Sequence, residues 1–454
     1  MQKSLAKRES TRSQRCWVAV ALALLSNGTW GEELMGLMQA YEAARAHDPV
    51  FKGAQAVRDE GLEHQAIGQA KLLPIISGVV SSNQNQSRVT EASGRTDNRG
   101  RYASNTSSLQ LRQPLYDREA WAAKEQGTAR TAASEALFRF REQELIVRVF
   151  EAYSKALLAR EEVSLVKAQL QSADELLRAN EQRLLQGEGT RTDMLETRSK
   201  QALIQAELIV AQDRAQHAID ALQAIVGKPV SRLDRLSPRG AARLVFGALD
   251  DWRSKVFDAN PEVESLKHTL EAARQEVRRV DSGHYPRLAL ILSVGNNDSD
   301  TTSTYRQSSR TTTVGVQLNV PIFAGGSVSA QSRQAVAQLV KAQADLDARV
   351  AELEVELHRQ YSAQKNGFLR IAALESAVAT SHALIEATQR SFIGGERTNV
   401  DVLNAQERLA QSVHDLAQAR YEQLVAGLRL RHLAGVLGEA DLREVASHFG
   451  GEIN

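Results

Sequence analysis

Two long heptad seams separated by a glycine turn constrain the fold of this chain more than any other feature. From Leu145 to Leu184, mostly small or apolar residues recur at alternating steps of four and three, and a second seam runs from Met194 to Ile225. Such spacing is typical of helices that pack along their length. Because Gly187 lies between the seams, the pattern predicts two helices folded back on each other. At roughly 1.5 Å per residue the first helix alone would be about 60 Å long.

The same pattern occurs twice. Three residues of the first turn have counterparts 208 positions later in the second: Gly187 and Gly395, Thr190 and Thr398, Asp193 and Asp401. Prolines upstream also recur as pairs: Pro49 and Pro261, Pro74 and Pro286, Pro114 and Pro321. The sequence therefore predicts a tandem duplication, with a first repeat over 31–235, a second over 236–438 and a C-terminal tail over 439–454.

The first 30 residues differ in kind from the rest. Five basic residues precede the apolar run CWVAVALALL (16–25), which is followed by Ser26, Asn27 and Gly28. This order predicts a signal peptide over 1–30, because ten apolar residues fall short of the roughly 20 needed to span a bilayer. Its removal would take away Cys16, the only cysteine, and with it disulfide and thiolate chemistry.

Each repeat is expected to contain a helix, a β-hairpin and a helical hairpin. The β-hairpins are placed at about 75–115 and 287–322, and the helical hairpins at about 118–227 and 326–438. Strand alternation is clearest where Leu288, Leu290 and Leu292 alternate with Ala289 and Ile291. The polar stretches 88–105 and 296–313 are interpreted as the hairpin loops.

Strands of about ten residues suit a tilted membrane strand, which needs roughly 9 to 11. The alternation alone fits equally well a soluble four-stranded sheet with one polar face. The signal peptide, the duplication and the long helices favour the membrane interpretation. Since closed barrels begin at about eight strands, several copies would have to share one barrel, because bare strand edges are not tolerated in lipid.

Together these motifs resemble the TolC family of outer-membrane tunnel proteins over essentially the whole mature chain. The resemblance is carried by the Asp48-Pro49 and Asn260-Pro261 turns, the helix-to-strand junctions at Pro74 and Pro286, the strand-to-helix junctions at Pro114 and Pro321, and the GERTNVDVLNA turn (395–405). The stretch AIGQAKLLP (66–74) is most similar to the branch that serves type I protein secretion.

The resemblance implies a fold that is mainly α with membrane β. In that fold a trimer forms a twelve-stranded outer-membrane β-barrel continuous with a periplasmic α-helical barrel, and each protomer consists of two tandem repeats. The implied partners are two further copies of the chain, a periplasmic adaptor protein, an inner-membrane ABC transporter or other pump, outer-membrane lipid, and a secreted-protein or small-molecule cargo. Nothing in the charge pattern suggests nucleic acid.

The resemblance also implies a periplasmic gate at the tip of the second helical hairpin. Residue by residue, Asp401 and Asn404 would ring the narrowest point, Arg397 would face Thr192, and Phe392 would face Asp193. Two of these residues depart from the family pattern. Asn404 replaces a second acidic residue, which would weaken the ring, and Phe392 lacks the hydroxyl with which a tyrosine could donate to the acid.

The two aspartates also have a simpler interpretation. Asp193 and Asp401 each follow a threonine by three residues at the start of a helix, where a carboxylate caps free N–H groups and complements the helix dipole. Capping alone would explain both aspartates without a gate, although it would leave Arg397 unexplained.

No catalytic, cofactor or metal site is expected. The ten histidines form no H-E-x-x-H spacing, and no G-x-x-x-x-G-K-[ST] loop is present. The chain is therefore expected not to be an enzyme. The favoured function is the exit duct of a type I protein exporter, the first alternative is the outer-membrane part of a drug or metal efflux pump, and the second is a periplasmic coiled-coil adaptor or scaffold.

Overall fold

The computed structural model describes residues 34–90, 92–94, 96–237, 247–299 and 307–450. The expected signal peptide, residues 1–30, lies outside this part of the chain. The first half contains β1 (Leu34–Met35), α2 (Leu37–His47), α3 (Pro49–Ala70), β2 (Ile75–Thr90), β3 (Thr96–Tyr116), α4 (Arg118–Leu185), α5 (Arg191–Val226) and β4 (Arg232–Leu233). The second contains α6 (Leu249–Ala259), α7 (Pro261–Asp281), η1 (Ser282–His284), β5 (Arg287–Ser299), β6 (Gln307–Asn319), α8 (Ser327–Ile393), α9 (Asn399–Leu433) and α10 (Glu439–Ala446).

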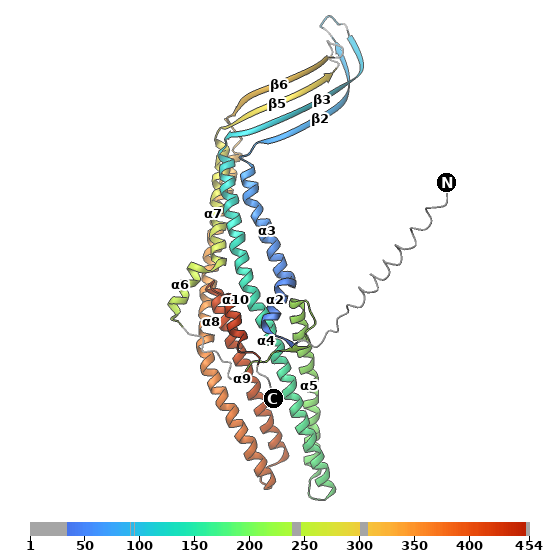
Figure 1. The fold of residues 1–454 in the computed structure, drawn as a ribbon, viewed down its shortest axis with the longest axis vertical. Coiled ribbons are helices and arrows are strands. Elements are labelled where there is room, and N and C mark those ends of the chain that lie inside the picture. Colours follow the sequence, from blue (N-terminus) through green and yellow to red (C-terminus); the bar gives the residue numbers. More distant parts are fainter. Residues whose placement is uncertain (1–33, 91, 95, 238–246, 300–306, 451–454) are drawn as a thin grey trace, which may run out of the picture.

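The molecule is a long helical rod with a sheet at one end (Figure 1). Helices α4 and α8 have 68 and 67 residues, and each folds back into a shorter partner, α5 or α9. The tips of the two helical hairpins form the end of the rod opposite the sheet. At the tips, Gly187 and Gly395 both adopt a φ of +78°, a backbone conformation that favours glycine.

The heptad seams are the packed faces of these helices. Val149, Ala156 and Ala173 of α4 are fully buried, as are Thr197 and Leu222 of α5. The equivalent seam of α8 buries Leu353 and Leu357, each 1% exposed. These residues form the packed faces of the long helices, as the heptad spacing predicts.

The four long strands form one antiparallel sheet in the order β2-β3-β5-β6. Cross-strand partners such as Leu109 with Val294 and Leu292 with Val314 lie on the same face. That face carries Ile76, Val80, Leu109, Leu111, Leu288, Leu290, Leu292, Val294, Val314, Val316 and Leu318. The opposite face is mainly polar and includes Ser77, Ser81, Thr106, Ser108, Gln110, Arg112, Ser293, Thr311, Thr313 and Gln317. Strands β2 and β6 are the edges of this sheet.

The hairpin loops expected at 88–105 and 296–313 were placed wrongly. Strands β2 and β3 remain paired from Ile75 and Arg112 to Thr90 and Thr96, and β5 and β6 pair from residue 287 to 299 and from 307 to 319. The expectation equated polarity with a loop. Backbone ladder bonds do not require apolar side chains, and a strand with both faces in water can be polar throughout.

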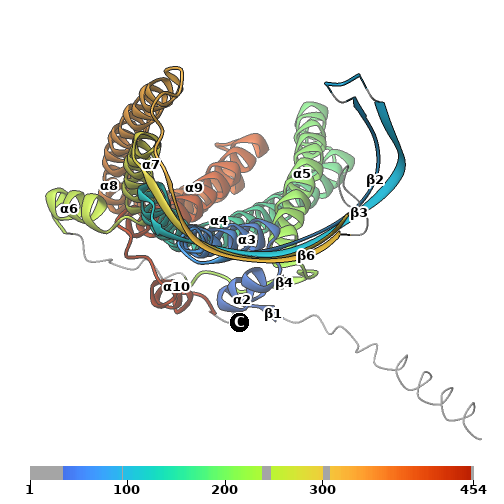
Figure 2. The ribbon, with the colours of Figure 1, turned by 90° about the horizontal axis from the view of Figure 1, so that it is seen from above.

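A smaller layer covers the middle of the rod. Figure 2 shows α2 and α10 on the convex side of the curve that the long helices form. The expected C-terminal tail is partly a helix, α10. Its Leu442 and Val445 are buried in the same core as Leu37 and Tyr41 of α2. Their spacing of three residues is a helical signal that the sequence analysis overlooked.

Candidate functional site

The expected gate lies at the turn between α8 and α9. Thr398 is the N-cap of α9, and its hydroxyl oxygen accepts from the Asp401 N–H at 3.3 Å. In return, Asp401 Oδ2 accepts from the Thr398 backbone N–H at 2.9 Å and from its hydroxyl at 3.0 Å. These hydrogen bonds lower the pKa of Asp401, and the bond from the Thr398 backbone N–H has the largest effect. Asp401 therefore caps its own helix and remains charged under mildly acidic conditions.

Arg397 lies beside the same carboxylate. Its Nη1 is 3.9 Å from Asp401 Oδ1, and its side chain is 61% exposed. Thr192 is exposed on α5, and within the described protomer no hydrogen bond or ion pair joins it to Arg397. A contact between Arg397 and Thr192 therefore stays a prediction for the assembled channel. Asn404, one turn after Asp401, is exposed as well.

Phe392 is half-buried near the end of α8, and the Arg183 guanidinium carbon lies 4.9 Å from its ring centroid. This cation–π contact joins α8 to α4 and needs no hydroxyl. Asp193 donates its N–H to Thr190 Oγ1 at 3.1 Å, which caps α5. No described hydrogen bond joins Asp193 to the second hairpin, so its expected position opposite Phe392 also stays a prediction.

The structure adds a set of tip residues that the sequence analysis did not select. Asn180 of α4, Thr197 of α5 and Asn399 of α9 are 3%, 0% and 5% exposed. Asn399 Nδ2 donates to Asn180 Oδ1 at 2.5 Å, and Asn180 Nδ2 donates to Thr197 Oγ1 at 2.9 Å. We call Asn180, Thr197 and Asn399 the tip link. The sequence does contain a sign of this contact, because Asn180 and Thr197 are polar residues at heptad seam positions. Polar side chains at such positions commonly fix the register of packed helices.

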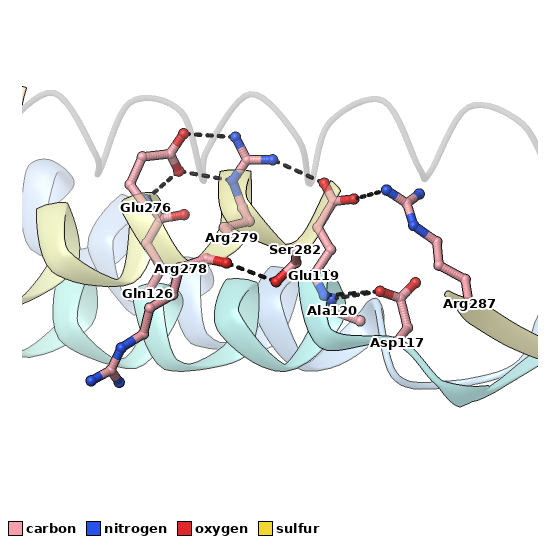
Figure 3. Close-up of polar contacts among 9 residues, drawn as sticks. All are labelled: Asp117, Glu119, Ala120, Gln126, Glu276, Arg278, Arg279, Ser282 and Arg287. Carbon is pink, nitrogen blue, oxygen red and sulfur yellow. Dashed lines mark hydrogen bonds and ion pairs between the residues drawn. The ribbon is translucent and has the colours of Figure 1, made fainter. Parts of the chain in front are cut away.

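The opposite end of the helices holds a charged network (Figure 3). Arg279 of α7 contacts Glu276 at 2.7 Å and Glu119 of α4 at 2.9 Å. Glu119 also binds Arg287 of β5 at 2.7 Å, and Gln126 of α4 donates to Glu276 at 2.9 Å. We call these five residues the junction network. The hydrogen bond from Arg279 is the main cause that lowers the pKa of Glu276.

Neighbouring contacts strengthen this junction. Asp117 caps α4 by accepting from the N–H groups of Glu119 and Ala120 at 3.0 and 3.2 Å. The Arg118 guanidinium stacks over the Tyr285 ring with 3.9 Å to the centroid. The junction network and the contact between Arg118 and Tyr285 cross-link the two repeats where helices give way to strands.

Comparison with known proteins identifies the family. The model of the family described as outer membrane efflux protein matches residues 40–228 and 252–436, one match in each half. The chain is 38% identical to the alkaline protease secretion protein AprF of Pseudomonas aeruginosa, over 91% of this chain and 87% of that protein. It is 36% identical to the proteases secretion protein PrtF of Dickeya chrysanthemi, over 95% of each.

Solved structures agree on the fold. The Campylobacter jejuni CmeC outer membrane channel superposes with a TM-score of 0.79 at 15% identity, covering 93% of this chain and 94% of that one. The outer membrane protein VceC of Vibrio cholerae gives a TM-score of 0.74 at 20% identity, covering 88% and 96%. The two family matches, the end-to-end similarity and the shared rod-and-sheet architecture show that the chain belongs to the outer membrane efflux protein family, the TolC-like channels of the outer membrane.

Proposed function

We propose that this protein is the outer-membrane exit duct of a type I protein secretion system. The observation that carries the proposal is the 36–38% identity, over nearly the whole chain, to two proteins named for protease secretion. Similarity to outer membrane proteins of solvent and toluene efflux pumps is lower, at 23% over 60% of the chain. By analogy with AprF and PrtF, the cargo would be a secreted protein.

We further propose that the duct is a homotrimer. Each protomer brings four strands whose outer members, β2 and β6, have no partner on their other side among the described strands. Three protomers would close twelve strands into a barrel and leave no edge in lipid. Helix α8 supports this assembly, since Val340, Val355 and Leu369 are 64%, 71% and 70% exposed in the protomer. A neighbouring copy would cover part of that surface.

Within this duct, residues 1–30 would be removed on export, and the repeats 31–235 and 236–438 would each supply one β-hairpin and one helical hairpin. The energy for transport would come from an inner-membrane ABC exporter, joined to the duct through a periplasmic adaptor protein. The periplasmic opening would be lined by Asp401, Asn404 and Arg397. The contacts around it would be made by Thr192, which would face Arg397, and by Asp193, which would face Phe392.

Deletion of the gene tests the cargo class. The expected result is that one large protein accumulates inside the cells, while sensitivity to small toxic compounds is unchanged. Restoring the gene should restore release of that protein. The opposite outcome, broad sensitivity without a trapped protein, would favour drug efflux, a role suggested by 28% identity to the outer membrane efflux protein BepC of Brucella suis over 92% of the chain.

A second experiment tests the assembly. The mature protein should fractionate with the outer membrane and migrate as a multimer that dissociates on heating. Recovery as a soluble periplasmic monomer would contradict the barrel and would favour the adaptor or scaffold alternative.

A further inference from the structure

We propose that a patch of five cations on the outer side of the rod, near its middle, binds the carboxylates of the peptidoglycan wall. The patch consists of Arg160 and Lys167 of α4, together with Lys228, Arg232 and Arg235 in the segment that follows α5. We call these five residues the mid-rod patch. The proposal goes beyond the role as an exit duct and applies to any cargo, since a duct that crosses the periplasm has to pass the wall.

The segment after α5 presents its cations outward. Val230 and Leu233 are 5% and 7% exposed and pack in the main hydrophobic core, whereas Lys228, Arg232 and Arg235 are exposed. Strand β4 pairs with β1 and lies beside α2 on the convex side of the long helices (Figure 2). Because the apolar residues anchor the segment in the core, the three cations face the outer surface of the rod.

Hydrogen bonds to α4 hold this segment in place. Tyr153 Oη accepts from the Asp234 N–H at 2.9 Å, and Arg160 Nη2 donates to the Ser231 carbonyl at 2.7 Å. Lys167 lies seven residues after Arg160, two turns further along the same face of α4. Figure 2 shows α4 in the middle of the curve, away from its two ends, where neighbouring copies would join. The mid-rod patch therefore remains accessible in an assembled duct.

The five cations are not neutralised by ion pairs. Within the described part of the chain, none of them lies in an ion pair with a carboxylate. Burial is the main cause that lowers the pKa of Arg160, and the positive charge of Arg235 lowers it further. Two guanidinium groups thus lie close enough to repel each other, and an anion bound between them would relieve that repulsion.

The acidic residues that adjoin the mid-rod patch are engaged elsewhere. Asp234 Oδ2 lies at the N-terminus of α2, where the helix dipole favours a negative charge. Glu161 accepts from Tyr421 Oη at 3.2 Å, and burial raises its pKa. Glu162 forms an ion pair with Arg214 at 2.8 Å. Even if the charges of Asp234 and Glu161 are included, the surface remains positive.

An anionic polymer fits this surface better than a small anion. Arg160 and Lys167 are about 10 Å apart along α4, and the other three cations lie on a different element. A small anion would contact only part of the patch, whereas a polymer with repeated carboxylates would contact all of it. Guanidinium groups bind carboxylates through two parallel hydrogen bonds, and three copies of the patch around a trimer would add avidity.

The position along the rod favours the wall over an adaptor protein. Arg160 lies about 60 Å along α4 from the junction with the sheet, and α4 continues for about 25 Å beyond Lys167. An adaptor that connects the duct to the inner membrane would meet the tips first. Between the outer membrane and the tips, a rod of this length has to cross peptidoglycan, whose stem peptides carry free carboxylates.

Co-sedimentation of the purified full-length protein with isolated peptidoglycan sacculi tests the proposal. We expect the wild type to pellet with the sacculi and to be released as the salt concentration rises. Arg232→Glu combined with Arg235→Glu should lower the bound fraction severalfold, because two exposed cations become anions. Lys167→Glu should act in the same direction and tests the patch separately if the first variant fails to assemble. Sacculi whose carboxylates have been converted to neutral amides should bind less of the wild type.

Arg443 provides the matched control. It is exposed on α10, on the same convex side of the rod, and pairs with Glu439 at 2.5 Å, so Arg443→Glu should bind sacculi like the wild type. Absence of wild-type binding, wild-type binding by both patch variants, or equal binding to amidated sacculi would each overturn the proposal. Patch variants that still bind sacculi but no longer co-purify with a periplasmic adaptor would overturn it too, because the patch would then be an adaptor contact. A protein that binds sacculi but exports no protein would contradict only the proposed function.

Discussion

The two ends of the helical rod join the two repeats with different chemistry. At the membrane end, the junction network uses two arginines and two glutamates, and Arg279 and Glu119 each bind two partners. At the periplasmic end, the tip link joins neutral side chains, with one hydrogen bond between the repeats. The charged contacts between the repeats near the tip are the Lys200–Glu407 ion pair at 2.6 Å and the stack of Arg183 on Phe392. Ionised hydrogen bonds with several partners are stronger than neutral ones, so we expect the junction to be the more firmly fixed end.

This difference matches what each end has to do in a duct. The sheet continues directly from α7 and into α4, so a rotation at the junction would disturb the register of every strand. In the proposed gate, the periplasmic end would widen to pass cargo. A contact that is specific but small can be released by a partner whose binding favours the open state by a few kcal/mol.

Breaking the junction network should have the largest effect on stability. Glu119→Ala leaves Arg279 and Arg287 facing each other without their shared carboxylate, and should lower the free energy of unfolding by about 1–2 kcal/mol per protomer. The measurement is the temperature at which the protein unfolds. Glu125→Ala on the same helix removes a more exposed carboxylate 3.7 Å from Lys124, and should leave this temperature almost unchanged. An equal shift in both variants would contradict a special role of the junction.

Acidification should affect the two ends of the rod differently. Because hydrogen bonds from Arg279 and Gln126 lower the pKa of Glu276 below its usual 4.5, the folded state holds this carboxylate charged where the unfolded chain begins to protonate it. Its contribution is present above pH 4.5 and is lost as the pH falls through the lowered value. Glu276→Gln should therefore flatten the acid dependence of unfolding, while Asn399→Leu should keep the wild-type slope, since the tip link has no titratable group.

Charge at the tip should set ion selectivity. Asp401→Ala should reduce cation selectivity and weaken block by multivalent cations added from the periplasmic side, and Asn404→Asp should strengthen that block by adding a second acidic ring. Thr398→Ala is the matched control, since it removes the cap but keeps the carboxylate. Reversal potentials in a salt gradient measure the selectivity. If Asp401→Ala and Thr398→Ala weaken the helix equally and neither changes selectivity, Asp401 is a cap and not a gate residue.

The smallest effect is expected at Arg397. Its side chain is 61% exposed and 3.9 Å from Asp401, and exposed ion pairs contribute little because water and salt screen them. Arg397→Ser should raise single-channel conductance only slightly, and the increase should shrink at high salt. A large increase that persists at high salt would place the main closing contact at Arg397.

The repeated pattern of the sequence was enough to predict the general architecture. The heptad seams predicted α4, α5, α8 and α9, and residues of those seams such as Val149, Thr197 and Leu353 are buried. The alternation from Leu288 to Val294 correctly placed one apolar face on the sheet. The strand ends were wrong because polarity was taken for a loop, and α10 was missed because eight residues give a weak periodic signal.

What the sequence by itself determined is what local periodicity encodes: long paired helices, their duplication, the glycine turns and the two-faced strands. The tertiary structure alone decided the partners of individual side chains. Asn180 meets Asn399 across 219 positions, Phe392 meets Arg183, and Glu119 meets Arg279 and Arg287. The physical reason is that a heptad or an alternation fixes which face of an element is buried, whereas the relative shift and rotation of two packed elements depend on the whole interface. Those two quantities determine which polar groups come within hydrogen-bond distance.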